Sequence, residues 1–294
     1  MLRTGYAFHS TNHMIVSGFT FCRNAVKYDY PLVESIRSAL PLCDEFIVNV
    51  GRCEDGTLEL IQSIGDPRIK IVESVWDESL RKDGLIYSQQ TNIALSHCKG
   101  EWALYIQADE VLHEDDLPAL KRSMADHAGN PMVKGLLFRY LHFIADYWST
   151  NPWFYHKAVR IIRNNGEIES CGDAVGFHFK ATQQYLQSGP KEWLAYSGAR
   201  MFHYGWVKDA KTMLEKKREQ ASVYHGKHLP PAAAKELTGD AFRFEDYAVL
   251  KEFTGSHPAV MRARLAKARR WGARRNRWLN WRFYREITRR GFRG

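Results

Sequence analysis

Short apolar runs alternate with amphipathic segments along the first 110 residues of the chain. Runs of four to eight apolar residues with polar flanks are typical of buried strands, and apolar residues spaced three or four apart are typical of helices. These patterns predict four strands, at residues 14–21, 45–50, 68–74 and 102–106. They predict three helices between the strands, at residues 29–40, 57–64 and 84–98. Such alternation is typical of a mainly parallel sheet flanked by helices, so we expect an α/β fold.

The residues that directly follow the strands are the first place to look for a binding site. In open parallel sheets, ligands bind beyond the carboxyl ends of the strands. We therefore single out residues 21–24, 49–55 and 107–110, which follow the first, second and fourth predicted strands.

The pattern changes in the second half of the chain. Apolar runs predict further strands at residues 135–144, 158–164 and 199–206. The chain becomes charged and helical from residue 208, and Pro230-Pro231 interrupts this stretch.

These shifts predict three parts. We expect one large domain over residues 13–206, a mostly helical segment over 207–260 packed on it, and a tail over 261–294.

The positive charge is concentrated in this tail. The net charge is +9, but residues 261–294 hold thirteen Arg or Lys and one acid, Glu286, so the rest of the chain carries −3. Arg interleaved with Trp and Phe is typical of a segment that lies on an anionic membrane surface. Nucleic acid attracts the same charges, and a solvated tail is the third interpretation. We favour the membrane surface and expect no nucleic acid, because the acidic body offers no basic groove to continue the tail.

The cysteines and the N-terminus bear on the compartment. The five cysteines are scattered, and no CxxC pair occurs, which argues against a zinc site or a disulfide framework. The chain shows no signal-peptide core and no apolar stretch of membrane-spanning length. We expect a cytoplasmic protein, with a peripheral position on the inner face of the membrane as the alternative.

Five carboxylates follow the fourth strand within ten residues. Glu114, Asp115 and Asp116 precede Pro118, where acids cap the start of a helix and complement its dipole. The other two are the pair Asp109-Glu110, which stands at the predicted ligand edge. Carboxylates there are natural ligands for Mg²⁺ or Mn²⁺, while a solvated turn is the alternative.

Five short motifs in the first half occur in the order and spacing of a known family. They are Asn24 after the first strand, Asp55-Gly56-Thr57 after the second, Asn92 in the third helix, Gly100-Glu101-Trp102 before the fourth strand and Ala108-Asp109-Glu110 after it. Together they resemble the family 2 glycosyltransferases of GT-A fold over residues 13–125. The resemblance is greatest to the branch with an "ADE" motif, whose members often build lipopolysaccharide core or other surface glycans.

The resemblance implies a donor sugar linked to UDP, GDP or dTDP and a glycan or lipid-linked acceptor. It implies inversion in a single displacement, with Mn²⁺ or Mg²⁺ at the diphosphate. It also divides the large domain into a nucleotide-sugar half, residues 13–125, and an acceptor half, residues 126–206. Asn24, Asp55 and Asn92 become candidate donor contacts.

Three departures from the family pattern matter. Gln107 stands where many members have the first Asp of a DxD motif, which leaves Asp109 as the expected metal ligand and Glu110 as a second candidate. Asn49 and Val50 replace an acidic pair, and Thr91 replaces a common Arg. We keep Gln107 and Asn49 as candidate donor contacts and leave the nucleotide open.

The base that accepts the proton of the acceptor hydroxyl is predicted to be Asp173. It follows the strand at 158–164, as a catalytic acid segment does in related enzymes. A turn Asp beside Gly172 is an equal alternative, and Glu110, Glu169 and Glu192 stay open as bases.

Three residues complete the candidate site, one in the last predicted strand and two on the helix that follows it. His203, in Phe202–Trp206, is a candidate second metal or diphosphate ligand, and a structural hydrogen-bonding role is equally expected. Lys216 or Lys217 is a candidate diphosphate contact, although most helix lysines are simply solvated.

Two other functions are alternatives to sugar transfer. A nucleotidyltransferase needs a glycine-rich basic loop after the first strand, and residues 20–30 lack one. The other rival is a membrane- or nucleic-acid-binding protein that acts through its tail, with an inactive sheet domain. A hydrolase is disfavoured because neither HExxH nor GxSxG occurs.

Overall fold

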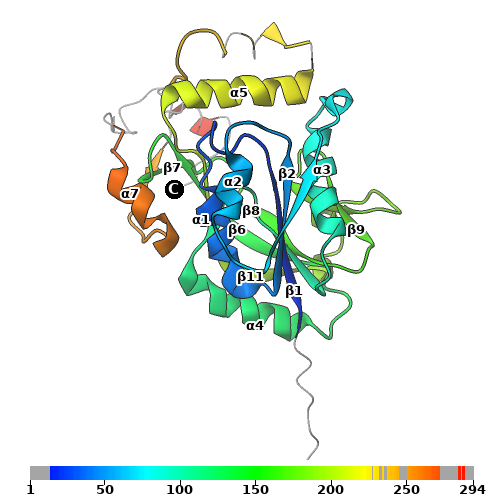
Figure 1. Ribbon diagram of the computed structural model, residues 1–294. Helices are drawn as coiled ribbons and strands as arrows, with labels where there is room; N and C mark the ends of the chain where they lie inside the picture. Colours follow the sequence, from blue (N-terminus) through cyan, green and yellow to red (C-terminus); the bar gives the residue numbers. More distant parts are fainter. Residues whose placement is uncertain are drawn as a thin grey trace, which may run out of the picture.

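The computed structural model describes residues 14–226, 228–231, 234, 237–244, 250–271, 284–285 and 287–288. A twisted central sheet carries helices on both faces (Figure 1). The helices are α1 (Leu32–Ala39), α2 (Thr57–Gln62), α3 (Leu85–Ser96), α4 (Leu117–His127), α5 (Ala210–His225) and α7 (Arg262–Lys267). The strands are β1 (Val16–Cys22), β2 (Glu45–Gly51), β3 (Ile69–Ser74), β4 (Trp102–Tyr105), β5 (Glu110–Leu112), β6 (Gly135–Ile144), β7 (Ser149–Thr150), β8 (Lys157–Arg163), β9 (Ile168–Cys171), β10 (Gly176–Phe179), β11 (Leu194–Trp206) and β12 (Lys251–Glu252).

Four parallel strands form the first half of the sheet, in the order β4-β1-β2-β3. All four lie where the hydrophobic pattern predicted strands, and α1, α2 and α3 lie between them in sequence as predicted. Parallel strands covered by helices on both faces read as near-continuous apolar runs, and β1, β2 and β4 are buried along almost their whole length. The predicted α/β fold with a mainly parallel sheet flanked by helices is confirmed.

The second half of the chain extends this sheet beyond β4. Strand β8 pairs antiparallel with β4, and β6 pairs antiparallel with β8. Strand β11 then pairs parallel with β6 and antiparallel with the short β5, which the sequence pattern did not predict. The register places His203 of β11 opposite both Glu110 of β5 and His142 of β6.

Two apolar layers hold the helices on the sheet. On one face, Ile36 of α1 and Leu120 of α4 pack in a cluster that includes Trp102 of β4. On the other face, α3 closes a cluster that contains Phe19 of β1 and Phe177 of β10. These residues are nearly or fully inaccessible to solvent, so the strand ends that carry the site are held on a rigid support.

Helix α5 runs across the top of the sheet in Figure 1, over the carboxyl ends of the parallel strands. Its N-cap is Asp209, whose carboxylate accepts hydrogen bonds from the backbone N–H groups of Lys211 and Thr212. Its apolar side packs in a cluster with Ile144 of β6. The helix therefore covers the edge of the sheet at which a ligand is expected.

The packed body continues past residue 260, where the sequence predicted a tail. Arg264 of α7 donates to Asp29 at 2.7 Å and to Glu34 at 3.0 Å, and Met261 is fully buried. The backbone N–H of Trp271 donates to Asp146. Most of the predicted membrane-surface segment, from residue 272 onward, lies outside the described residues. Among the helices that the structure describes, none is long and apolar enough to cross a membrane.

Candidate active site

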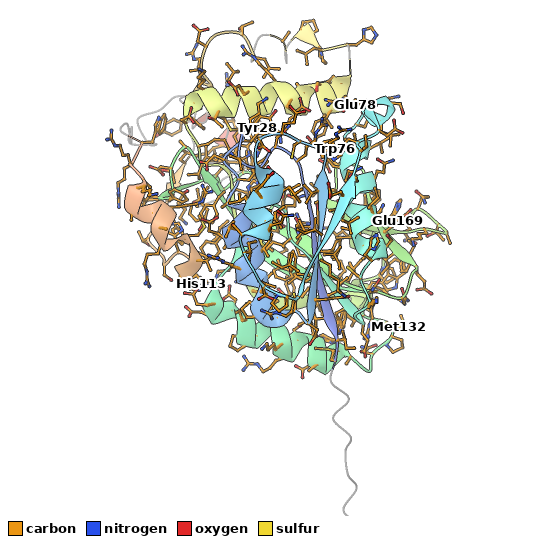
Figure 2. All side chains as sticks on the ribbon, viewed as in Figure 1. Tyr28, Trp76, Glu78, His113, Met132 and Glu169 are labelled. Atoms are coloured by element: carbon orange, nitrogen blue, oxygen red, sulfur yellow. The ribbon has the colours of Figure 1, made fainter. Side chains whose placement is uncertain are left out.

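A cavity of about 480 Å³ opens beneath α5, at the carboxyl ends of β1 and β4. Figure 2 shows Tyr28 and Trp76, two of its lining residues, directly below this helix. The polar lining residues are Arg23, Asn24, Gln107, Asp109, His142, Asp173, His203, Lys216, Lys217, Glu219 and Gln220. The aromatic lining residues are Phe21, Tyr28, Tyr30, Trp76, Tyr87, Phe154, Tyr155, Trp206 and Tyr224. The size and the mixed lining are those of a small-molecule site.

Asp109 stands at the floor of the cavity, in the turn between β4 and β5, and is 8% exposed. Its Oδ2 accepts a hydrogen bond from Lys216 Nζ at 3.1 Å, and the same ammonium donates to the carbonyl of Gly205 at 2.9 Å. Burial alone would raise the pKa of Asp109, but its neighbours, Lys216 above all and then His203 and Lys208, hold it well below its usual range. The carboxylate is therefore charged at neutral pH and held in one orientation.

His203 lies beside Asp109 near the end of β11. Its Nε2 is 3.7 Å from Asp109 Oδ1, and its Nδ1 is 3.2 Å from Nδ1 of His142 on β6. Nε2 of His142 in turn contacts the carbonyl of Tyr155 at 2.8 Å. Burial lowers the pKa of His203 despite the nearby carboxylates, and it lowers that of His142 to about 3. Both imidazoles are therefore neutral at pH 7.

The residues at this place fit a divalent cation. Asp109 Oδ1 and His203 Nε2 offer a hard oxygen and an imidazole nitrogen side by side. Gly205 lets the backbone approach both side chains closely, because a Cβ at this position would lie only 2.3 Å from Asp109 Oδ2 and 2.9 Å from His203 Nε2. Across the described part of the chain, no cluster of three or more His, Cys, Asp or Glu would hold a metal by itself. Nucleotide sites for Mg²⁺ and Mn²⁺ commonly use few protein ligands and add phosphate oxygens and water.

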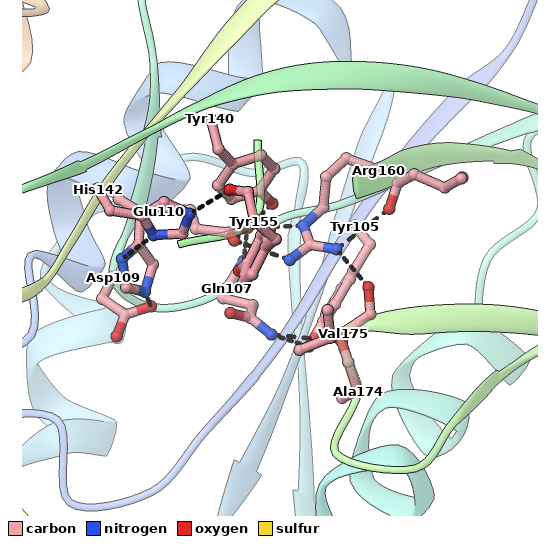
Figure 3. Close-up of polar contacts among 12 residues, drawn as sticks. Tyr105, Gln107, Asp109, Glu110, Tyr140, His142, Tyr155, Arg160, Ala174 and Val175 are labelled. Carbon is pink, nitrogen blue, oxygen red and sulfur yellow. Dashed lines mark hydrogen bonds and ion pairs between the residues drawn. The ribbon is translucent and has the colours of Figure 1, made fainter. Parts of the chain in front are cut away.

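Glu110 is not among the residues that line the cavity. It forms an ion pair with Arg160 in which both side chains are 0% exposed, with Oε1 and Oε2 accepting from Nη2 at 2.9 Å and Nε at 3.0 Å. It also accepts from the hydroxyl of Tyr140 and the backbone N–H of Gln107. Figure 3 shows this cluster next to Asp109, with Arg160 reaching the carbonyl of Val175. The contacts favour a structural role for Glu110.

Asp173 also lines the cavity, from the turn between β9 and β10. Its Oδ2 accepts from the hydroxyl of Tyr224 on α5 at 2.8 Å, and Oδ1 accepts from the backbone N–H of Val175 at 3.3 Å. The other two distant candidates for the base are not among the lining residues. Glu169 pairs with His178 on the outer hairpin, and Glu192 is exposed in a short 3₁₀ helix.

Of the predicted donor contacts, Asn24 and Gln107 reach the cavity with Lys216. Asn24 follows β1 with a φ of 55°, and Gln107 Nε2 donates to the carbonyl of Ala174 at 3.3 Å. The remaining donor candidates, Asn49, Asp55 and Asn92, are not among the lining residues.

These three side chains instead tie neighbouring segments together. Asn49 is fully buried and donates to the carbonyl and side chain of Gln90 in α3. Asp55 accepts from the backbone N–H groups of Lys27 and Thr57, and so fixes the loop after β1. Asn92 exchanges two hydrogen bonds with the backbone of Ser170 in β9.

Sequence reasoning did not single out several residues of the cavity. Trp76 stands two residues after β3, so the same strand-end rule, applied to the third strand, predicts it. Arg23, which belongs to the singled-out range 21–24, lies over the Trp76 ring at 5.1 Å. Lys208 is not a lining residue but is buried beside the lining residue Tyr30, 4.6 Å from the ring, and no local signal distinguishes it from a solvated lysine. No local signal in the sequence reveals His142 either, because its partner His203 lies 61 residues away.

Comparison with known proteins places the chain in a family. Residues 19–186, more than half of the chain, match the profile described as "Glycosyl transferase family 2". A search of curated proteins gave no match.

Among solved structures, the chain is similar to TarS from S. aureus, with 14% identity, a TM-score of 0.41, and 76% of this chain and 42% of that chain covered. It thus spans less than half of that TarS chain. A shorter TarS in complex with UDP-GlcNAc gives 14% identity, a TM-score of 0.40, and 76% and 70% coverage. The mannosyltransferase PcManGT from Pyrobaculum calidifontis, in complex with GDP-Man and Mn²⁺, gives 16% identity, a TM-score of 0.36, and 52% and 45% coverage. From the extent of the profile match, the chain belongs to glycosyl transferase family 2.

Proposed function

We propose that this chain transfers a sugar from a nucleotide-sugar donor to a hydroxyl of a glycan or lipid-linked acceptor, with inversion at the anomeric carbon. The observation that carries the proposal is one cavity at the carboxyl ends of the parallel strands, lined by Asp109, His203, Lys216 and Asp173. Membership of the family supports sugar transfer as the reaction.

The floor of the cavity suits a diphosphate. Lys216 is 4% exposed and held by Asp109 and Gly205, so its ammonium is positioned before a ligand arrives. Arg23 and Lys217 add positive charge to the lining of the cavity. Mn²⁺ or Mg²⁺, held by Asp109 and His203, would neutralise charge on the departing diphosphate.

Asp173, another lining residue, is the proposed general base. It takes the proton of the acceptor hydroxyl while the acceptor oxygen bonds to the anomeric carbon and the bond from that carbon to the diphosphate breaks. The nucleoside diphosphate leaves with the electron pair of the broken bond. The hydroxyl of Tyr224 fixes the carboxylate in place. A single displacement of this kind inverts the anomeric carbon.

The acceptor and the location are narrower proposals. The Ala108-Asp109-Glu110 motif supports a surface-glycan acceptor such as lipopolysaccharide core. The basic, aromatic-rich residues from 272 onward support a position on the inner face of an anionic membrane. The alternative of an inactive sheet domain with a binding tail is disfavoured by the charged, preformed cavity.

Thermal stabilisation tests the donor and the metal together. The melting temperature is measured with UDP-, GDP- and dTDP-sugars, each with and without Mn²⁺, for the wild type, Asp109→Asn and the control Glu192→Gln. We expect at least one donor to raise the melting temperature only with Mn²⁺, and the effect to be lost in Asp109→Asn and kept in Glu192→Gln. No shift for any donor would contradict the proposed function. A shift that ignores both Mn²⁺ and Asp109→Asn would contradict the metal site.

A truncation tests the role of the tail. Because residues 261–271 are packed on the body, the cut is placed after residue 271. Donor stabilisation is expected to survive this cut, and binding to vesicles of anionic lipid is expected to fall.

A further inference from the structure

Two neighbouring strands bring two imidazoles into direct contact. His142 of β6 and His203 of β11 are register partners in a parallel pair, so their side chains project from the same face of the sheet. Their Nδ1 atoms are 3.2 Å apart, which is hydrogen-bond distance. One of these two nitrogens must therefore carry the hydrogen and the other must accept it.

The carbonyl of Tyr155 decides which one does. A carbonyl only accepts, so Nε2 of His142, 2.8 Å away, carries a hydrogen. His142 is 3% exposed and packs against the rings of Tyr140, Phe154 and Tyr155. Within the described residues, the groups bonded to its two nitrogens are a carbonyl and an imidazole, and neither is an anion. The imidazole is thus neutral, and its Nδ1 holds a lone pair.

His203 must then donate its Nδ1–H to His142. A neutral imidazole has one N–H, so Nε2 of His203 holds a lone pair and faces Asp109 Oδ1 at 3.7 Å. This separation exceeds hydrogen-bond distance, as expected for two acceptors with no proton between them. The backbone of Gly205 lies close to both side chains, since a Cβ there would overlap Asp109 Oδ2 and His203 Nε2.

We propose that His142 is a positioning residue that fixes His203 in the Nδ1–H tautomer, so that Nε2 of His203 and Oδ1 of Asp109 form a paired acceptor site for a divalent cation. The use of such a cation site rests on the proposed function, whereas the hydrogen-bond geometry does not depend on it. A hydrogen bond to the far nitrogen orients metal-bound imidazoles in general, and loss of such a partner costs 10- to 100-fold in metal affinity or activity.

The buried cluster around Glu110 supports His142 through the ring of Tyr140. The hydroxyl of Tyr140 donates to Glu110, and the Tyr140 ring stacks on His142 with centroids 5.3 Å apart. The ion pair between Glu110 and Arg160 therefore supports the ring that supports His142.

Nitrogen NMR of the metal-free full chain, labelled with ¹⁵N-histidine, tests the tautomers directly. Signals are assigned by their loss in His142→Phe and His203→Asn. We expect Nε2–H for His142 and Nδ1–H for His203. An Nε2–H tautomer, or a doubly protonated ring, for His203 at pH 7.5 would overturn the proposal.

Binding of Mn²⁺ alone, followed by the electron paramagnetic resonance signal of the free ion, tests the consequence. We expect His142→Phe, which keeps a ring but removes the acceptor, to weaken Mn²⁺ binding about tenfold. His142→Asn places an acceptor near the former Nδ1 and is expected to restore most of the affinity. The control is His178→Phe, a buried imidazole outside the cavity, which should leave Mn²⁺ binding unchanged.

The outcomes separate this inference from the proposed function. Equal Mn²⁺ affinity in the wild type and a folded His142→Phe, or no binding to the wild type, overturns the inference. The predicted tautomers and Mn²⁺ pattern, together with no binding of any nucleotide sugar, support the inference and contradict the proposed function.

Discussion

Replacing Glu110 with Gln separates a structural carboxylate from a metal-binding one. The substitution preserves size but removes the negative charge that faces Arg160, whose side chain is 0% exposed. Breaking a buried ion pair by changing one partner typically costs about 3–5 kcal/mol, because the remaining charge is left uncompensated. Gln keeps an acceptor for Arg160 and Tyr140, so we expect the lower end, about 3 kcal/mol. Since the free energy of unfolding of natural proteins is about 5–15 kcal/mol, this loss is a large fraction of the total stability.

Urea unfolding followed by circular dichroism measures the effect. The control is Glu101→Gln, an exposed acid at the start of β4, for which we expect a change within about 0.5 kcal/mol. Combining Glu110→Gln with Arg160→Met should cost less than the sum of the two single changes, because both remove the same interaction. Unchanged stability of Glu110→Gln with lost Mn²⁺ binding would refute the reasoning and identify Glu110 as a metal ligand.

Three further predictions concern the cavity and the C-terminal segment. Gly205→Ala places a Cβ 2.3 Å from Asp109 Oδ2, so Mn²⁺ affinity measured by paramagnetic resonance should fall at least tenfold, whereas Gly129→Ala, in open space, should have no effect. Asp173→Asn should lower the rate of nucleoside diphosphate release in the presence of acceptor by about 10²–10⁴-fold while donor stabilisation of the melting temperature persists; unchanged turnover would remove Asp173 as the base. Burial lowers the pKa of His257 to about 4, and its Nδ1 bonds the hydroxyl of Tyr204. Between about pH 4 and 6.5 the unfolded chain therefore binds more protons at this residue than the folded chain does. The free energy of unfolding should fall as the pH drops through this range. His257→Asn should flatten this part of the curve of unfolding free energy against pH, and an unchanged slope would contradict the assignment.

The strands and helices of the first half follow from hydrophobic periodicity because the parallel strands are buried on both faces. The site residues at the strand ends are harder to predict from sequence, and the pair Asp109-Glu110 shows why. Asp109 lies in the turn between β4 and β5 and faces the cavity, whereas Glu110 begins β5 and is buried in the sheet. There Glu110 meets Arg160, which is 50 residues away. No local pattern reveals which of two adjacent acids turns inward.

Asn49 illustrates the same difficulty in a different element. It stands close to the carboxyl end of β2, where the strand-end rule expects a ligand contact, yet the pleat points it at α3 and its amide bonds Gln90. Position along a strand is readable from sequence, whereas the face to which a side chain points depends on register with strands that are distant in the chain. The predicted residues that do reach the cavity from turns, Asn24, Gln107 and Asp109, lie beyond the last paired residue of their strand.

Strand β11 positions the residues of the candidate metal site through its pairing with two other strands. It pairs antiparallel with β5 and parallel with β6, so one register fixes His203 against Glu110 on one side and His142 on the other. The backbone N–H of Tyr204 also donates to the carbonyl of Asp109 at 2.8 Å, which ties the turn to the same strand. A slip of one residue would turn His203 to the opposite face, where Phe143 and Tyr204 form an apolar cluster. The irregular register between His203 and Trp206 spans Gly205, where any side chain would overlap Asp109 and His203. Bulges often re-aim the chain next to active sites, so the irregularity and the glycine together account for how a buried strand brings an imidazole against the Asp109 carboxylate at the cavity.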